Sequence, residues 1–298
     1  MGELYTAWMK DHLQTIEQVL PAYLPQADGL RDPVIEAMTY ACAAGGKRIR
    51  PVLTMEFCRL TCGETARALP FAAAVEMIHS YSLIHDDLPC MDNSPMRRGK
   101  PAVHMAFGEN MAVLAGDALL NRAFEILLRP SECGAVTAKQ TLAAASALAE
   151  AAGIAGMVGG QTIDLRYEGQ PVDLSLLETL QRGKTAALLI ASCVMGAIIG
   201  GGTPEQIEAA RQYGENIGLC FQIVDDILDV TSTPEQMGKP TGSDAQNQKA
   251  TYVSLLGIEE ATKLAQQRTA AAIEALSPYG RDKDGLCSLA QALLRRDH

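Results

Sequence analysis

The sequence predicts an all-α protein built as a single domain. Aromatic residues make up 5% of the 298 residues, and Ala, Leu and Gln are abundant. Alternating β-branched runs, the usual sign of strands, are nearly absent. No Pro/Ser-rich linker, repeat or low-complexity tract divides the chain. We therefore expect residues 1–298 to form one bundle of many helices.

Proline and glycine mark the ends of the first predicted helices. An apolar stripe over Glu3–Leu20 predicts a helix that Pro21 ends. A second helix, over residues 33–44, leads into Gly45-Gly46, a pair typical of a helix C-terminus and tight turn. Pro51 then opens the next helix in a favourable first-turn position.

Helical patterns continue from about Pro70 to the C-terminal end. Residues 112–160 predict two or more Ala/Leu-rich helices, and residues 259–296 are helical in pattern, with no chemistry expected in them. Residues 185–204 carry no charge and approach the length of a membrane span. Because a Gly-Gly-Gly-Thr-Pro run closes this segment early, we expect a buried core helix and no stable membrane insertion.

Charge and cysteine usage restrict the partners and the compartment. The net charge of −10 makes nucleic acid and anionic membranes unfavourable partners. The eight cysteines are irregularly spaced, without a CxxC pair, and no signal-peptide pattern begins the chain. We expect free thiols in a reducing cytoplasm.

Two acidic clusters stand in apolar surroundings. Asp86, Asp87 and Asp92 follow an apolar run, and Pro89 should break the helix so that Asp92 can turn back toward Asp86. Far downstream, Asp225 and Asp229 share one face of an apolar helix, with Asp226 beside them. Solvated helix ends are the simpler interpretation of either cluster alone. Carboxylates in apolar surroundings need cations, however, and Mg²⁺ typically joins one or two of them to substrate phosphates. The two clusters together predict a polynuclear Mg²⁺ site for a diphosphate.

At these residues the chain resembles the trans-isoprenyl diphosphate synthases. The resemblance spans nearly the whole chain, in the right order: Gly45–Pro51 (GGKRIRP), Asp86–Asp92, Arg97–Pro101 (RRGKP), Lys184-Thr185, Asp225–Asp229 and residues 238–252. It implies the isoprenoid synthase fold, helices around a central cavity, and a homodimer. Prenyl transfer from an allylic diphosphate, dimethylallyl or geranyl, to isopentenyl diphosphate is the implied reaction. The chain departs from the family in having Asn93-Ser94-Pro95, where members often carry more aspartates.

The resemblance also implies a role for each site residue. The metal site comprises Asp86, Asp92 and Asp225 as ligands, with Asp87, Asp226 and Asp229 in support. The allylic diphosphate is expected to contact Arg97, Lys184, Thr185, Gln222 and Lys239, with Lys249 on the same polar, lid-like loop. The diphosphate of isopentenyl diphosphate is expected to contact Lys47, Arg50, His79 and Arg98. Departure of the leaving group should depend most on Asp86, Asp92, Asp225, Arg97, Lys184 and Lys239.

Other sites and activities fit the sequence less well. Lys184-Thr185 lacks the upstream glycine and the strand of a phosphate-binding P-loop, because Glu178 stands at the glycine position. His79 and His85 have no zinc-ligand partners. A class I terpene cyclase usually pairs its first motif with an Asn/Ser/Glu triad, and a non-catalytic subunit would be expected to have lost a motif.

Tyr81 is the predicted determinant of product length. It lies five residues before Asp86, roughly 7.5 Å along a helix axis, and its ring could block a growing chain. In the related enzymes an aromatic residue here accompanies bacterial-type farnesyl synthases. The sequence therefore predicts farnesyl diphosphate as the product, with a geranylgeranyl synthase as the alternative.

Overall fold

The fold is all-α, as the sequence predicts, with one short hairpin. The computed structural model describes residues 2–129, 136–232, 250–280 and 282–296. Its elements are α1 Gly2–Tyr23, α2 Asp32–Cys42, α3 Ile49–Cys62, η1 Ala66–Ala68, α4 Leu69–Asp86, β1 Met96–Arg97, β2 Lys100–Pro101, α5 Val103–Phe107, α6 Glu109–Leu127, α8 Ala138–Ala152, α9 Met157–Tyr167, α10 Leu174–Gln181, η2 Arg182–Ala186, α11 Ala187–Ile199, α12 Pro204–Thr231, α15 Tyr252–Leu256, α16 Ile258–Ala275, η3 Ser277–Tyr279 and α17 Asp284–Leu294.

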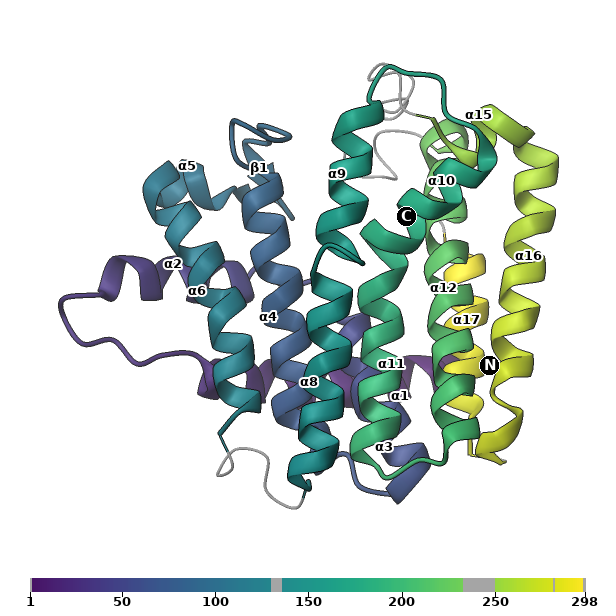
Figure 1. Ribbon diagram of the computed structural model, residues 1–298, viewed down its shortest axis with the longest axis horizontal. Coiled ribbons are helices and arrows are strands. Elements are labelled where there is room, and N and C mark those ends of the chain that lie inside the picture. The colour runs from purple at the N-terminus through teal and green to yellow at the C-terminus, as the bar shows by residue number, and fades with distance from the viewer. Residues whose placement is uncertain (1, 130–135, 233–249, 281, 297–298) are drawn as a thin grey trace.

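The long helices run side by side. Figure 1 shows α6, α4, α8, α11, α12 and α16 as roughly upright neighbours, with α1 and α3 passing behind them. Direct contacts join α4 to α6, α11 to α3, α8 and α12, and α12 to α16. This arrangement places the C-terminal end of α4 and the C-terminal half of α12, which carry the two acidic clusters, on either side of one cavity.

Helix α11 is a core helix. Leu188, Cys193 and Met195 on it are buried. By length and composition alone, two stretches, Ala138–Tyr167 and Leu174–Ile199, could cross a membrane, but 61% of the second stretch's window is buried inside the protein. Core helices pass the same test, which agrees with the predicted core helix.

Helix α1 continues past the proline that was expected to end it. Its last residue is Tyr23, and Pro21 lies inside its final turn. Leu20 and Leu24, on either side of Pro21, are both buried. A proline so close to the end removes a single backbone donor, and we infer that apolar packing outweighs that loss.

Candidate active site

A cavity of about 940 Å³ gathers most of the predicted site residues. It lies between the end of α4, the C-terminal half of α12, the residues before and at the start of α3, the hairpin β1–β2 and η2. The predicted residues that line it are Lys47, Arg50, His79, Asp86, Asp92, Arg97, Arg98, Lys184, Thr185, Gln222 and Asp225. Side chains from positions 47 to 225 therefore share one space, as the resemblance implies.

The first acidic cluster turns back on itself after α4. The helix ends at Asp86, and the backbone N–H of Asp92 donates to the Asp86 carbonyl at 2.9 Å. Both side chains face the cavity, as predicted from Pro89. Asp87 points elsewhere: it is buried, and its carboxylate accepts hydrogen bonds from Arg97 Nε at 3.1 Å and Nη2 at 2.5 Å. Asp87 thus holds Arg97 at the cavity edge.

The charge on Asp86 is costly in this position. Burial raises the pKa of its carboxyl group, while the nearby Lys184 ammonium lowers it in part. A carboxylate in this state is stabilised by any further cation that enters the cavity. The position of Lys184 therefore affects how readily Asp86 stays ionised.

The second acidic cluster divides in the same way. Asp225 faces the cavity, whereas Asp226 and Asp229 are buried. Asp226 accepts from the backbone N–H of Tyr252 at 2.8 Å and from Gln222 Nε2 at 3.2 Å. Asp226 therefore orients Gln222 and anchors the chain that follows residue 249. Its role is to support the residues that line the cavity.

Basic side chains also converge on this cavity. Lys47, Arg50, Arg98 and His79 all line it. Within the part of the chain that the structure describes, the buried Nε of Arg50 has no hydrogen-bond partner. Burial lowers the pKa of Arg50 to about 10, Glu76 offsets part of the shift, and Arg98 adds to it. An anion is the ligand that such a group lacks.

His79 lies among these basic side chains, where its charged form is disfavoured. Burial holds its pKa well below the ordinary value, and the charges of Arg50 and Arg98 lower it further. Lys47 also has a lowered pKa, from burial first and then from the charge of Arg296. The pocket can thus donate hydrogen bonds to a diphosphate while already carrying several positive charges.

Local backbone geometry aims these cations. Arg98 and Gly99 form the two-residue turn of the β1–β2 hairpin, both with positive φ, +53° and +76°, as a type I′ turn requires. The Arg98 guanidinium packs over Gly46, where a Cβ would lie 2.6 Å from it, and donates to the Gly45 carbonyl. Arg48, in contrast, turns inward and is buried against Glu76 at 2.6 Å.

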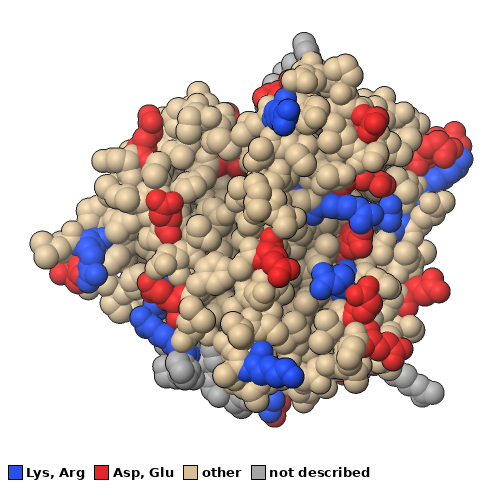
Figure 2. Space-filling model, viewed as in Figure 1, with Lys and Arg blue, Asp and Glu red and all other residues tan. Residues whose placement is uncertain are grey.

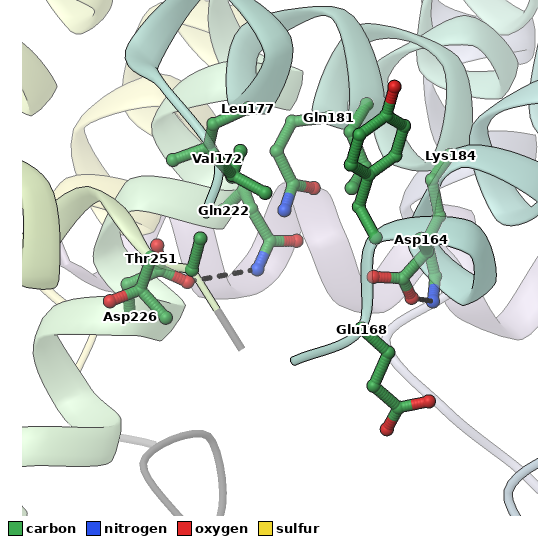
Figure 3. Close-up of a pocket in the computed structure, with 12 residues that line it drawn as sticks. Asp164, Glu168, Val172, Leu177, Gln181, Lys184, Gln222, Asp226 and Thr251 are labelled. Carbon is green, nitrogen blue, oxygen red and sulfur yellow. Dashed lines mark hydrogen bonds and ion pairs between the residues drawn. The ribbon is translucent and has the colours of Figure 1, made fainter. Parts of the chain in front are cut away.

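The Lys184-Thr185 pair lies in a π-helical turn, η2. The Lys184 ammonium donates to Asp164 Oδ2 on α9 at 2.5 Å (Figure 3). Thr185 donates to Gln222 at 3.3 Å, and Gln222 in turn reaches Asp226. Single π turns inside α-helices are frequent at functional sites, and this one faces both side chains toward the cavity.

Two residues near the cavity were not singled out in the sequence. Arg296, in the tail where no chemistry was expected, pairs with Asp225 at 2.6 Å and lies over the Phe221 ring at 3.9 Å. Asp164 is the partner of Lys184. Neither residue belongs to a motif quoted above. For Arg296, the Arg-Arg pair that follows an apolar helix in the sequence could have indicated a functional residue.

The remaining predicted residues lie elsewhere. Lys239 and Lys249 lie outside the described residues. Tyr81 is buried on α4, with its ring edge-on to His85 at 5.8 Å between centroids. His85 contacts the Val113 carbonyl of α6 at 3.2 Å. Tyr81 therefore lies one turn or more below Asp86, as its position in the sequence requires.

The carboxylates fit a metal that a substrate helps to bind. Among the described residues, no three His, Cys, Asp or Glu side chains could together hold a metal ion. Asp86, Asp92 and Asp225 nevertheless face one cavity together with several cations. Mg²⁺ characteristically uses one or two carboxylates, water and substrate phosphates, so this donor set suits Mg²⁺ bridged by a diphosphate.

Known proteins match the chain over nearly its full length. The polyprenyl synthetase family model matches residues 32–283. A heterodimeric geranylgeranyl pyrophosphate synthase large subunit 1 of Arabidopsis thaliana is 46% identical, covering 91% of this chain and 75% of that protein. Geranylgeranyl pyrophosphate synthase 12 of the same plant is also 46% identical, over 94% and 78%. The structure of an FPP/GFPP synthase from Zymomonas mobilis aligns with a TM-score of 0.88 at 40% identity, covering 99% of this chain and all of that one.

Proposed function

The chain belongs to the polyprenyl synthetase family, and we propose that it condenses isopentenyl diphosphate with an allylic diphosphate in a Mg²⁺-dependent reaction. The observation that carries the proposal is one cavity that brings carboxylates and cations together. Asp86, Asp92 and Asp225 line it along with Lys47, Arg50 and Arg98. Two diphosphates, one bound through metal and one bound directly, complement this arrangement.

The chemistry needs stabilisation of a departing diphosphate. The allylic C–O bond breaks and its electron pair leaves with the diphosphate, the double bond of isopentenyl diphosphate attacks the allylic cation, and a proton is lost to the departing diphosphate. Mg²⁺ supplies positive charge to the leaving group when bound. Lys184 and Arg97 add fixed charge there, and the isopentenyl diphosphate bound by Lys47, Arg50 and Arg98 keeps its C–O bond.

Two end products have support. The plant relatives are named geranylgeranyl synthases, and geranylgeranyl diphosphate is the product that the comparisons favour. Tyr81 is the specific observation in favour of farnesyl diphosphate, because it is a large buried ring on α4, the helix that leads to Asp86. The structurally similar Zymomonas mobilis protein is named an FPP/GFPP synthase.

Chromatography of the dephosphorylated products distinguishes these possibilities. Wild-type protein and Tyr81→Ala are incubated with labelled isopentenyl diphosphate and dimethylallyl diphosphate. Farnesol from the wild type and longer alcohols from the variant support the Tyr81 argument, whereas geranylgeraniol from the wild type supports the relatives' product. Diphosphate release that requires both substrates supports prenyl transfer in either case, and release from the allylic substrate alone would indicate a cyclase.

We propose that the protein acts as a homodimer through the face formed by α6, α8 and α9. Large apolar side chains are exposed there, among them Leu114, Leu142, Val158 and Leu165. Charged side chains are thinly scattered over this part of the surface (Figure 2), and apolar patches of this kind are typical of interfaces. Sedimentation equilibrium should give twice the chain mass, and Leu142→Glu should shift it toward the monomer; a monomeric wild type would contradict the proposal.

A further inference from the structure

Lys184 lies on the wall between two cavities. It lines the 940 Å³ cavity together with Asp86 and also a smaller side pocket of about 120 Å³. Asp164, Gln181, Gln222 and Asp226 line the side pocket, and the ammonium of Lys184 points to the Asp164 carboxylate in it (Figure 3). Lys184 thus reaches a partner that is not among the residues lining the large cavity.

The backbone holds the two partners at a fixed separation. A Cβ at Gly160 would lie 2.1 Å from the backbone nitrogen of Lys184, and one at Gly183 would lie 3.0 Å from the Gly160 Cα. Helix α9 and η2 therefore touch backbone to backbone, with no side chain between them. Asp164 follows Gly160 by four residues and so shares its face of α9. This packing brings its carboxylate to the Lys184 ammonium.

The ion pair between Lys184 and Asp164 is largely shielded from solvent. Its distance is 2.5 Å, and the side chains of Lys184 and Asp164 are 28% and 19% exposed. A free lysine has a long, flexible stem that samples many rotamers. An anchored lysine keeps its charge in a single place at the boundary of the large cavity.

We propose that Asp164 is a positioning residue, which holds the Lys184 ammonium where the allylic diphosphate departs. The inference rests on the proposed function and deepens it. Asp164 acts through Lys184 and does not itself touch the substrate. Its loss should therefore affect the allylic substrate and its diphosphate, and leave the isopentenyl pocket of Arg50 and Lys47 as it was.

A double-mutant cycle tests this coupling. The variants are Asp164→Asn, Lys184→Gln and the two combined. Asp164→Asn should lower kcat/KM for the allylic substrate about tenfold, as expected for one partly exposed charge-assisted hydrogen bond, and leave KM for isopentenyl diphosphate within about twofold. In the Lys184→Gln background the same change should add less than about twofold, because coupled residues are not additive.

A binding measurement separates this inference from the proposed function. Isothermal titration of inorganic diphosphate with Mg²⁺ should show the same cycle: about tenfold weaker binding in Asp164→Asn and little further loss when Lys184 is already changed. This readout needs no turnover, so it tests the pair even if the wild type fails to condense the two substrates. An equal loss in both backgrounds, or an equal rise in KM for isopentenyl diphosphate, would overturn the positioning role.

Two further variants control for folding. Asp164→Glu keeps the charge and should recover most of the binding, which a purely structural loss would not allow. Glu168→Gln removes an exposed carboxylate four residues further along the chain, at the edge of the same side pocket, and should leave both readouts within about twofold of the wild type. If Asp164→Asn unfolds, as shown by thermal denaturation, near-wild-type diphosphate binding in Asp164→Glu together with weakened binding in Lys184→Gln would support the positioning role. Unchanged binding in Lys184→Gln, or lost binding in a folded Asp164→Glu, would refute it.

Discussion

The buried charge of Arg50 should lower the stability of the ligand-free protein, and a bound anion should offset this loss. Within the described part of the chain, the buried Nε of Arg50 has no partner. Burial and the charge of Arg98 lower its pKa to about 10, despite the opposing effect of Glu76. The folded protein therefore holds this proton less tightly than the unfolded chain. Its positive charge opposes folding at every pH below about 10, and the penalty fades only as the pH rises further.

The size of the penalty follows from this shift. Each pKa unit corresponds to about 1.4 kcal/mol, but the cavity admits water, so we reduce the sum to about 1–2 kcal/mol. Arg50→Met keeps the length of the stem and the helix propensity of α3. It should raise the midpoint of thermal unfolding of the ligand-free protein by about 2–3 °C.

The same substitution should weaken the binding of isopentenyl diphosphate. Losing charge-assisted hydrogen bonds should raise KM for isopentenyl diphosphate about 10- to 100-fold, with a smaller effect on the allylic substrate. Isopentenyl diphosphate without metal should raise the unfolding midpoint of the wild type and do so far less in the variant. Arg67→Met, which removes an arginine from the surface Arg67–Glu64 pair, is the matched control and should leave both quantities nearly unchanged. A variant that is less stable when empty, or equally impaired for both substrates, would refute the reasoning.

Three further predictions concern the metal site, the C-terminal arginine and pH. EDTA should abolish activity, and added Mg²⁺ should restore it. Asp86→Ala or Asp225→Ala should each lower the reaction rate by a factor on the order of 10²–10³. Full activity in either variant would show that the substituted residue does not belong to the site. Arg296→Ala should lower the half-saturating Mn²⁺ concentration about fivefold, as measured by electron paramagnetic resonance. The reason is that the ion pair between Arg296 and Asp225 must open before a metal ion can bind the Asp225 carboxylate. An unchanged concentration would show that the ion pair does not compete with the metal. Burial lowers the pKa of His12, but its interaction with Glu56 and its hydrogen bond with the Trp8 carbonyl, added to the charges of Glu56 and Asp11, together outweigh burial and leave the pKa raised. The resulting stabilisation is complete below the unfolded pKa and is lost as the pH rises through the folded pKa. Chemical unfolding of His12→Gln should lack that part of the pH dependence.

Much of the site was predictable because its chemistry is local in the sequence. The aspartate clusters, the cations after Gly46 and the hairpin arginines each occupy a few consecutive residues in apolar surroundings, where their cost indicates a ligand. The turn after Asp86 followed from the constraint of a single proline. The all-α class followed in the same way from helical periodicity repeated over nearly the whole chain.

Tertiary structure alone decided which of these side chains face the cavity. Asp87 and Asp226 stand in the same motifs as Asp86 and Asp225, yet each is buried and bound by a neighbour, Arg97 or Tyr252. Adjacent residues on a helix point about 100° apart, so one residue of each pair turns inward when the other faces the ligand. The sequence shows the pair, and the packing of the neighbouring helices determines the direction of each member.

Tertiary structure also decided which residues distant in the sequence pair with residues of the site. Arg296 lies 75 residues from Phe221, whose carbonyl it reaches at 2.5 Å, and Lys184 lies 20 residues from Asp164. The Arg-Arg pair at positions 295 and 296 hints at a ligand, but not at which residue it meets, and an aspartate on a helix looks like an ordinary surface charge in the sequence. Only the close backbone contact at Gly160 and the packing of α17 against α12 bring them to the cavity. Such contacts depend on how whole helices pack, and no short stretch of residues encodes that.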